Sequence, residues 1–237
     1  MNGPAVFARC LPDLPRWLEI RDLLRTGDAE IFGLCTEPEL TLIVRDPQTE
    51  CLFVVGTPAE AALRAAVERG AKGGVIVPEE PASTWIAQLL PDWTRTRILL
   101  HMLPNLQCLP PASSTVRVLD PATLSLHDLP AELVEELASA ARSSLIAATF
   151  VDAQPVAFCY AGSVSESLWD VAIDTLVAHR RRGYAAQCAA HVIRHMARQG
   201  QQAVWAAVER NPASWRLAQK LGFVVVDELA IFEHSAG

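Results

Sequence analysis

Residues 179–185 read HRRRGYA and stand between two apolar stretches of different character. The stretch before them, LWDVAIDTLV at 168–177, has the length and composition of a β-strand. The stretch after them, AAQCAAHVIRHMARQG, places apolar residues at i, i+3, i+4 and i+7, namely Ala189, Val192, Ile193 and Met196. That spacing gives a helix one buried face. The quoted residues are therefore predicted to form a strand-to-helix turn that carries three arginines and a glycine.

A turn of this kind can hold an anion. The first N–H groups of a helix have no intrahelical acceptor, and the helix dipole adds positive potential at the same end. Gly183 allows close approach of the backbone, and Ala185 keeps the next position small. Arg180, Arg181 and Arg182 add charge that is not lost by titration. A solvated basic turn with a capping glycine explains the heptapeptide equally well.

The rest of the C-terminal half alternates strand and helix patterns. The segments 143–151 and 155–164 flank Asp-Ala-Gln and predict an antiparallel hairpin. Further strands are predicted at 115–120, 202–209 and 223–232, and helices at 128–142 and 213–221. Asn211 and Pro212 are typical of a helix start.

Two motifs on these elements occur in a known order. RRRGYA fits Arg/Gln-x-x-Gly-x-Gly/Ala through Arg180, Gly183 and Ala185, and NPASWRLAQKLGF follows at 211–223. With these motifs, residues 115–235 resemble the GNAT superfamily of acyl-CoA N-acyltransferases. The resemblance implies an α/β fold in which a mixed, splayed β-sheet is flanked by helices. The sheet would open between strands 168–177 and 202–209.

The resemblance also implies how coenzyme A would bind. The pantetheine arm would pair with the free strand edge through Thr175, Leu176 and Val177. The diphosphate would bind the backbone N–H groups of Arg181, Arg182, Gly183, Tyr184, Ala185 and Ala186. Arg180 and Arg182 would contribute charge. Acetyl-CoA is the expected donor, used as a co-substrate.

Acyl transfer to an amine requires a proton acceptor and a stabilised oxyanion. Four carboxylates are within reach in the sequence: Glu166, Asp170, Asp174 and Glu209. Strand alternation places Asp170 and Asp174 on one face. Asp170 is the first choice as base, because some relatives carry a glutamate near this position, and Glu209 is the second. Each has a structural or solvated alternative role. The N–H of Val177 is the expected oxyanion donor.

The proton donor to the departing thiolate is less defined. Many relatives carry a tyrosine seven residues after the asparagine, whereas this chain has Ala218 there. Ser214 could substitute, directly or through water. Alternatively no acid is needed, because a thiol of pKa near 8.5 leaves readily as the anion. Asn211 and Ser214 could instead contact the cofactor or cap the helix.

The N-terminal half repeats part of this plan. Helices are predicted at 58–70 and 81–90, and strands at 73–78 and 95–103. PASTWIAQLL at 81–90 and PASWRLAQKL at 212–221 share six of ten residues, which indicates an internal duplication or a chance match of short helices. With LPPASS at 109–114 as a linker, residues 1–110 form a degenerate α/β half and 115–237 the catalytic domain.

Nothing in the N-terminal half matches RRRGYA. One acyl-CoA site per chain is therefore expected. The N-terminal half would cover the sheet and wall the acceptor cleft.

Composition narrows the classes of partner and compartment. A net charge of −7 disfavours a general nucleic-acid binder, and no apolar run is long enough to span a membrane. The N-terminus shows no signal-peptide pattern. Six scattered cysteines without a CxxC pair indicate a reduced, cytoplasmic protein with buried thiols. His191 and His195 have i, i+4 spacing but no third ligand, so no metal site is expected. A monomer or homodimer is expected.

The leading interpretation is an N-acyltransferase that acetylates a small-molecule amine. A non-catalytic acyl-CoA sensor is the alternative, because the tyrosine is missing. An interaction protein built from two degenerate halves is the third interpretation.

Overall fold

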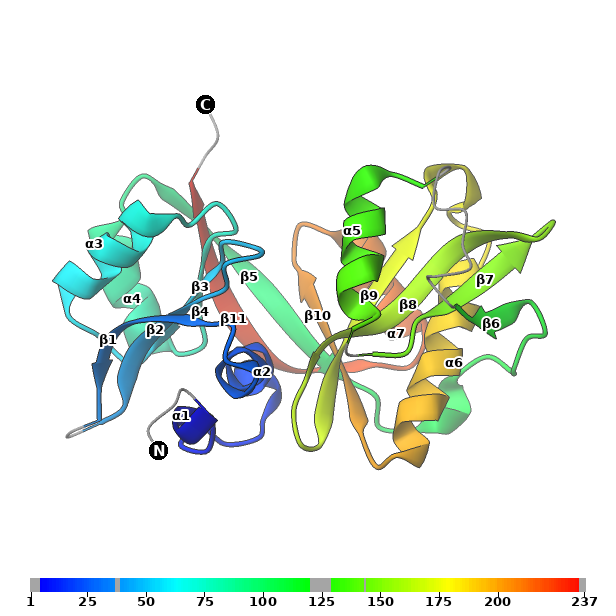
Figure 1. Cartoon of the computed structure of the whole chain (residues 1–237), viewed down its shortest axis with the longest axis horizontal. Coiled ribbons are helices and arrows are strands. Elements are labelled where there is room, and N and C mark those ends of the chain that lie inside the picture. The colour runs from blue at the N-terminus through cyan, green and yellow to red at the C-terminus, as the bar shows by residue number, and fades with distance from the viewer. Residues whose placement is uncertain (1–4, 37–38, 120–128, 143, 235–237) are drawn as a thin grey trace. The chain divides into compact units, whose positions relative to one another are not determined.

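The computed structural model describes residues 5–36, 39–119, 129–142 and 144–234 (Figure 1). The chain divides into two compact units. The first comprises Met1–Leu100, Ala206–Trp215 and Val225–Gly237, and the second comprises His101–Trp205 and Arg216–Val224. The strands β5, β10 and β11 and the helix α7 contribute residues to both units.

The elements up to residue 102 are α1 (Ala5–Ala8), η1 (Pro15–Trp17), α2 (Leu18–Thr26), β1 (Glu30–Cys35), β2 (Thr41–Arg45), β3 (Leu52–Val55), α3 (Glu60–Arg69), β4 (Val75–Val77), α4 (Glu80–Leu89) and β5 (Trp93–Met102). The elements after it are η2 (Leu106–Cys108), β6 (Val116–Val118), α5 (Ala131–Ala140), β7 (Ala147–Val151), β8 (Gln154–Val164), β9 (Leu168–Thr175), η5 (Val177–His179), α6 (Tyr184–Arg198), β10 (Gln202–Val208), α7 (Pro212–Lys220) and β11 (Val224–His234). The η elements are short 3-10 turns.

In the first unit the strand order is β1-β2-β3-β4-β11-β5. The β1–β2 and β2–β3 pairs are antiparallel, and β3–β4 is parallel. Alternation along the strands sorts apolar side chains onto two faces. Leu42 and Val44 pack with α2, whereas Ile43 packs with residues of α3 and α4.

In the second unit the strand order is β10-β9-β8-β7-β6. The pairs from β6 to β9 are antiparallel, and β9–β10 is parallel. The β7–β8 hairpin turns at Asp152 and Ala153, both at positive φ, as a tight hairpin requires. Phe158 and Tyr160 of β8 pack with α5, whereas Cys188 of α6 reaches the Ala147 and Ala157 carbonyls. The predicted mixed sheet flanked by helices is confirmed.

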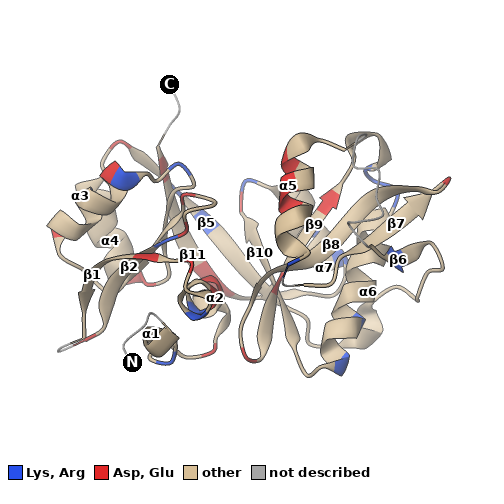
Figure 2. Cartoon of the chain, viewed as in Figure 1, with Lys and Arg blue, Asp and Glu red and all other residues tan. Residues whose placement is uncertain are grey.

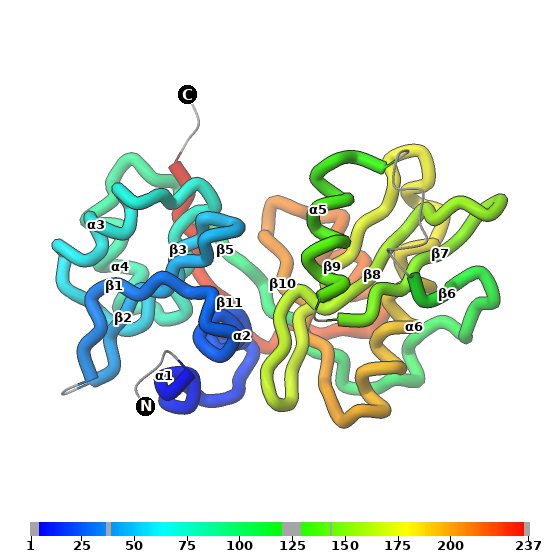
Figure 3. The backbone as a smooth tube through the Cα atoms, viewed as in Figure 1, coloured from blue at the N-terminus to red at the C-terminus, as the bar shows by residue number. Residues whose placement is uncertain are grey.

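The two halves of the sequence repeat one order of elements. The series β1-β2-β3-α3-β4-α4-β5 corresponds to β7-β8-β9-α6-β10-α7-β11, including one parallel pair in each. The last strand, β11, pairs antiparallel with β4 of the N-terminal half, with Ile231 opposite Ile76. Figure 3 traces the chain to the red β11, which lies among strands of the first unit.

This pairing explains why the units differ from the linear division at residues 110–115. The β11 strand adds Leu229 and Ile231 to one apolar cluster of the first unit and Ala230 and Phe232 to the other. The segment at the C-terminus is therefore grouped with the N-terminal elements. That residues 115–237 form the catalytic domain stays a prediction.

The structure also bears on the predicted burial of the cysteines and on the presence of long apolar helices. Cys159 and Cys188 are buried, but Cys10, Cys35 and Cys108 are exposed, so the prediction of buried thiols is wrong for these three. They lie after α1, at the end of β1 and in η2, in surface segments that the sequence context did not reveal. Within the described part of the chain, no helix is long and apolar enough to cross a membrane.

Candidate functional site

The predicted strand-to-helix turn joins β9 to α6. Its strand ends at Thr175, two residues earlier than predicted, and the 3-10 turn η5 follows. The chain reverses there, because the His179 and Arg180 N–H groups donate to the Leu176 and Val177 carbonyls, at 2.8 and 3.4 Å. Arg181 has φ +62°, a left-handed conformation that is costly for a residue with a Cβ. Local strain of this kind is concentrated at functional turns.

The N-terminus of α6 has the features of an anion site. Gly183 caps the helix at φ +85° without a side-chain hydrogen bond. The first intrahelical bond runs from the Gln187 N–H to the Gly183 carbonyl at 3.2 Å. The N–H groups of the preceding residues, Tyr184, Ala185 and Ala186, therefore have no acceptor within the helix. No acidic residue stands in the first turn.

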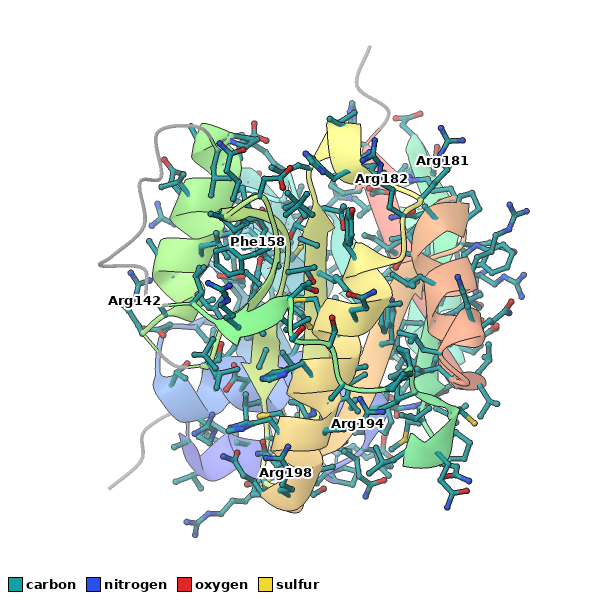
Figure 4. All side chains as sticks on the ribbon, turned by 90° about the vertical axis from the view of Figure 1, so that its right-hand side faces the viewer. Arg142, Phe158, Arg181, Arg182, Arg194 and Arg198 are labelled. Atoms are coloured by element: carbon teal, nitrogen blue, oxygen red, sulfur yellow. The ribbon has the colours of Figure 1, made fainter. Side chains whose placement is uncertain are left out.

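The arginines of the turn are exposed. Arg181 and Arg182 lie near the N-terminal end of α6, whereas Arg194 and Arg198 lie toward its other end (Figure 4). Arg194 is already engaged, because it donates to the Leu109 and Pro110 carbonyls. The charge near a ligand of the turn therefore comes from Arg180, Arg181 and Arg182, of which Arg180 donates from Nε to the Thr175 carbonyl.

The β9 strand has an open edge. It pairs with β10 from Leu168 to Asp170, and the register ends at the Asp170–Val204 pair. On its other side the Leu176 N–H donates to the Val156 carbonyl at 3.0 Å, while Thr175 lies opposite Ala157. In an antiparallel ladder this pattern makes Thr175–Ala157 a non-hydrogen-bonded pair. The N–H and C=O of Thr175 therefore point away from β8.

Alternation extends this edge toward the start of the strand. The backbone groups of Ile173 and Thr175 point away from β8 beyond the last pair with β10, and we call them the open edge. Of the three residues predicted to pair with pantetheine, Thr175 belongs to this edge. Leu176 has its N–H bound to β8, and Val177 lies in the η5 turn with 77% of its surface exposed.

Asp170 is the last residue of β9 that pairs with β10, and it lies near Gly162 of β8, where the β8–β9 register shifts. A Cβ on Gly162 would come within 3.2 Å of the Asp170 Oδ2 atom, so the glycine makes room for this carboxylate. Asp174 lies opposite Phe158, and the register places both aspartates on the face that α5 covers. The face shared by Asp170 and Asp174 agrees with the predicted strand alternation.

Asp174 shares its face with two further polar groups that the sequence analysis did not single out. The Tyr160 hydroxyl donates to Glu136 Oε2 at 3.0 Å, and Tyr160 is buried. Burial and the Glu136 charge raise the pKa of Asp174, while Arg180 acts in the opposite direction. Acidic residues lie on α5 and at the end of β9 in Figure 2. The only sequence signal was a tyrosine inside an apolar strand.

Glu209 follows β10 and is assigned to the first unit. Arg97 pairs with it at 2.5 Å and also reaches Glu228. The hydrogen bond from Arg97 lowers the pKa of Glu209. A carboxylate held in this way accepts a proton less readily than a free one. Glu166, another sequence candidate, is exposed between β8 and β9.

Asn211 and Ser214 act at the start of α7. The Ser214 N–H donates to Asn211 Oδ1 at 3.3 Å, which is the capping role considered from the sequence. Further along α7, Ala218 is fully buried, with an exposed fraction of 0%. Trp205 is a core residue, in edge contact with Phe223 at 5.5 Å between ring centroids.

The two histidines of α6, His191 and His195, lie one helical turn apart. Among the described residues, no group of three or more His, Cys, Asp or Glu side chains is arranged to hold a metal ion. His195 contacts Gln199 at 3.1 Å, and burial lowers the pKa of His191, with His195 and nearby arginines adding to the effect.

Part of the chain matches a known protein family. Residues 147–232 match the GNAT acetyltransferase family, a segment that begins with β7 and contains both motifs. No protein of curated function matches the sequence.

Solved structures resemble the whole chain. A GCN5-related N-acetyltransferase-like protein from Streptococcus suis has 17% identity and a TM-score of 0.69, with 97% of each chain covered. A GCN5-related N-acetyltransferase from Kribbella flavida has 16% identity and a TM-score of 0.61, covering 100% of this chain and 98% of its own.

A tandem GNAT protein from the clavulanic acid biosynthesis pathway has 10% identity and a TM-score of 0.59, with 98% of this chain and 93% of its own covered. The tandem protein is consistent with the repeated order of elements in the two halves. Residues 147–232 thus match the GNAT acetyltransferase family, and the chain has the fold of these GNAT structures.

Proposed function

We propose that this protein is an N-acyltransferase that takes an acetyl group from acetyl-CoA and transfers it to the amine of a small molecule. The observation that carries the proposal is the N-terminus of α6. A left-handed glycine cap, amides without intrahelical acceptors and three arginines lie together, with no carboxylate in the first turn. This combination suits a diphosphate. The open edge of β9, immediately before it, suits an extended arm that contains amide groups.

Proton removal from the amine is assigned to Asp170. At pH 7 only about one alkylamine molecule in a few thousand is neutral, because the pKa is near 10.4. Asp170 lies where β9 and β10 cease to pair, and the neighbouring Gly162 leaves space for its carboxylate. Glu209 is the weaker candidate, because Arg97 stabilises its charged form. A general base contributes about 10²–10⁴ to such a rate.

The remaining steps need one hydrogen-bond donor for the oxyanion and no strong acid for the departing thiolate. The oxyanion requires a backbone N–H, for which Val177 is the predicted donor and the open-edge amide of Ile173 is an alternative. At the usual tyrosine position, Ala218 is buried and offers no proton. Ser214 keeps the role of predicted alternative donor. A thiol of pKa near 8.5 also leaves as its anion unaided.

A second candidate is a sensor that binds acyl-CoA without turnover. The buried Ala218 favours it, because the helix position that carries an acid in many relatives has no proton to give. The enzyme is favoured by Asp170, because Gly162 leaves space for its carboxylate near the end of the β9–β10 pairing.

Titration calorimetry with acetyl-CoA, followed by a panel of small amines monitored by free thiol, separates the candidates. Binding with amine-dependent thiol release supports the transferase. Binding without release from any amine supports the sensor. Absence of binding contradicts both and leaves the interaction-protein interpretation.

Valine at position 183 is expected to weaken CoA binding by about tenfold or more. The cost is conformational, because Gly183 has φ +85° and a Cβ there meets no atom within 4 Å. A left-handed L-residue costs about 1–2 kcal/mol, and a β-branched one is still less tolerated. The relaxed turn would no longer direct the α6 amides at the diphosphate. Calorimetry with CoA measures the effect.

Gly200→Val is the matched control. Gly200 stands after the other end of α6 at φ +81° and is equally open, so valine is strained there in the same way. We expect similar destabilisation of both variants but unchanged CoA affinity for Gly200→Val. Equal affinities for Gly183→Val and wild type would contradict the assignment of the N-terminus of α6 as the diphosphate site.

One CoA molecule is expected to bind per chain. The N-terminal counterpart of the turn joins β3 to α3, and Glu60 stands in the first turn of that helix. Its carboxylate repels a diphosphate at the same end, and it already pairs with Arg64 at 2.6 Å. Calorimetry should give a stoichiometry near one, and a value near two would show that the N-terminal half binds as well.

A further inference from the structure

Arg180 folds back on the strand that it follows. Its Nε–H donates to the carbonyl of Thr175 at 3.1 Å, five residues earlier in the chain. The η5 turn between them makes this reach short, because two backbone hydrogen bonds close it. The contact lies on the exposed side of the turn, where a neutral carbonyl oxygen holds one edge of a guanidinium.

The carbonyl that Arg180 holds belongs to the open edge. Thr175 forms a non-hydrogen-bonded pair with Ala157, so its C=O points toward the side where an added strand would bind. An incoming amide chain needs that oxygen as an acceptor. In the free protein the Arg180 guanidinium therefore occupies the end of the open edge that is nearest α6.

A diphosphate would change the position that Arg180 prefers. Charge-assisted hydrogen bonds from a guanidinium to phosphate are roughly twice as strong as those to a neutral acceptor. The N-terminus of α6 begins four residues after Arg180, so the side chain that now bonds to Thr175 lies beside the proposed diphosphate position. Movement of the guanidinium to the phosphate would free the Thr175 carbonyl.

We propose that Arg180 is a specificity-determining residue that admits donors with a diphosphate and disfavours pantetheine thioesters without one. A complete CoA thioester displaces Arg180 from Thr175 by offering it a better partner. A pantetheine thioester offers no such partner and must compete with the guanidinium for the strand edge. The proposal rests on the proposed function, because it assumes that the CoA arm binds the open edge.

The test compares wild type with Arg180→Ala and uses two probes, CoA and pantetheine. CoA affinity is expected to fall about tenfold, because one phosphate partner is lost. Pantetheine affinity is expected to rise roughly three- to tenfold, because the net contribution of a competing hydrogen bond is removed. Arg180 is exposed, so the variant should fold, and circular dichroism checks this. Amide chemical shifts of residues 171–175 report the pantetheine titration.

Arg182→Ala is the matched control, with the same loss of charge in the same turn. Arg181 is unsuitable, because its positive φ adds a backbone effect. Arg182→Ala should weaken CoA binding and leave pantetheine affinity unchanged. Opposite changes of the two affinities in Arg180→Ala alone support the proposal.

The role of Arg180 is overturned if Arg180→Ala binds pantetheine as well as or less well than wild type does. It is also overturned if neither protein binds pantetheine detectably. In both cases CoA binding by wild type leaves the proposed function intact. Failure of wild type to bind CoA overturns the proposed function itself.

Discussion

Asparagine at position 170 is expected to lower turnover by about 10²–10⁴ while acetyl-CoA affinity changes by no more than about twofold. The substitution keeps the size of the side chain and removes its ability to accept a proton. Asp170 lies at the last pair between β9 and β10, beside Gly162, so the amide should occupy the same space. Steady-state thiol release and calorimetry with acetyl-CoA measure the two quantities separately.

Asp174→Asn is the matched control for Asp170→Asn. The two carboxylates lie four residues apart on one strand and face the same side. If Asp170 is the base, Asp174→Asn should reduce turnover far less. Equal loss of turnover and affinity in Asp170→Asn would indicate a structural role instead. No loss of either would transfer the assignment to Glu209, despite the Arg97 pair.

Asp174→Asn should also change the dependence of stability on pH. Burial and Glu136 raise the pKa of Asp174, with Arg180 opposing them and the Tyr160 hydroxyl facing the same region. A raised carboxyl pKa means that the folded state binds the proton more tightly than the unfolded state. Stability therefore falls as pH rises from the ordinary aspartate pKa through the raised value. Asparagine removes this loss, so the variant should be the more stable form above that range.

The local features of the second unit could be predicted from sequence because each has a local cause. A glycine at Gly183 and apolar spacing along 189–196 determine where α6 begins and which face is buried. Asn211 and Pro212 mark α7, and the Asp-Ala-Gln break marks the β7–β8 hairpin. The predicted end of β9 at residue 177 is two residues too late, because Leu176 and Val177 continue the apolar pattern although the chain turns there.

Long-range pairings could not be predicted, because no local pattern specifies a partner. The elements α2, β1, β2 and β3 were not recognised, and nothing in VVVDELAIF shows that β11 pairs with β4. The pairing of Arg97 with Glu209 joins residues 112 positions apart. Tyr160 and Glu136 likewise meet across a helix and a strand. Each of these depends on tertiary packing that a single sequence does not display.

Deletion of residues 223–237 is expected to unfold the first unit, although most of that unit lies before residue 101. The segment includes β11, which supplies Ile231 to one apolar cluster and Phe232 to the other, and which pairs with β4. Its loss exposes both clusters and leaves β4 without that strand. Arg16 also loses Asp227, which it binds through two hydrogen bonds. Limited proteolysis and the dispersion of amide signals from residues 39–100 measure the unfolding.

A single substitution gives the same test without shortening the chain. Phe232 is 1% exposed, so Phe232→Ala should lower the free energy of unfolding by about 3–5 kcal/mol, a large part of what a domain has. Val225→Ala, on the same strand but 50% exposed, should change it by less than about 0.5 kcal/mol. If the truncated chain kept native signals for residues 39–100, β11 would not be needed there, and residues 115–237 could be separated without unfolding the N-terminal half. If those amide signals lose their dispersion, the C-terminal half cannot be separated without unfolding the N-terminal half, because the last strand of the chain completes the first unit.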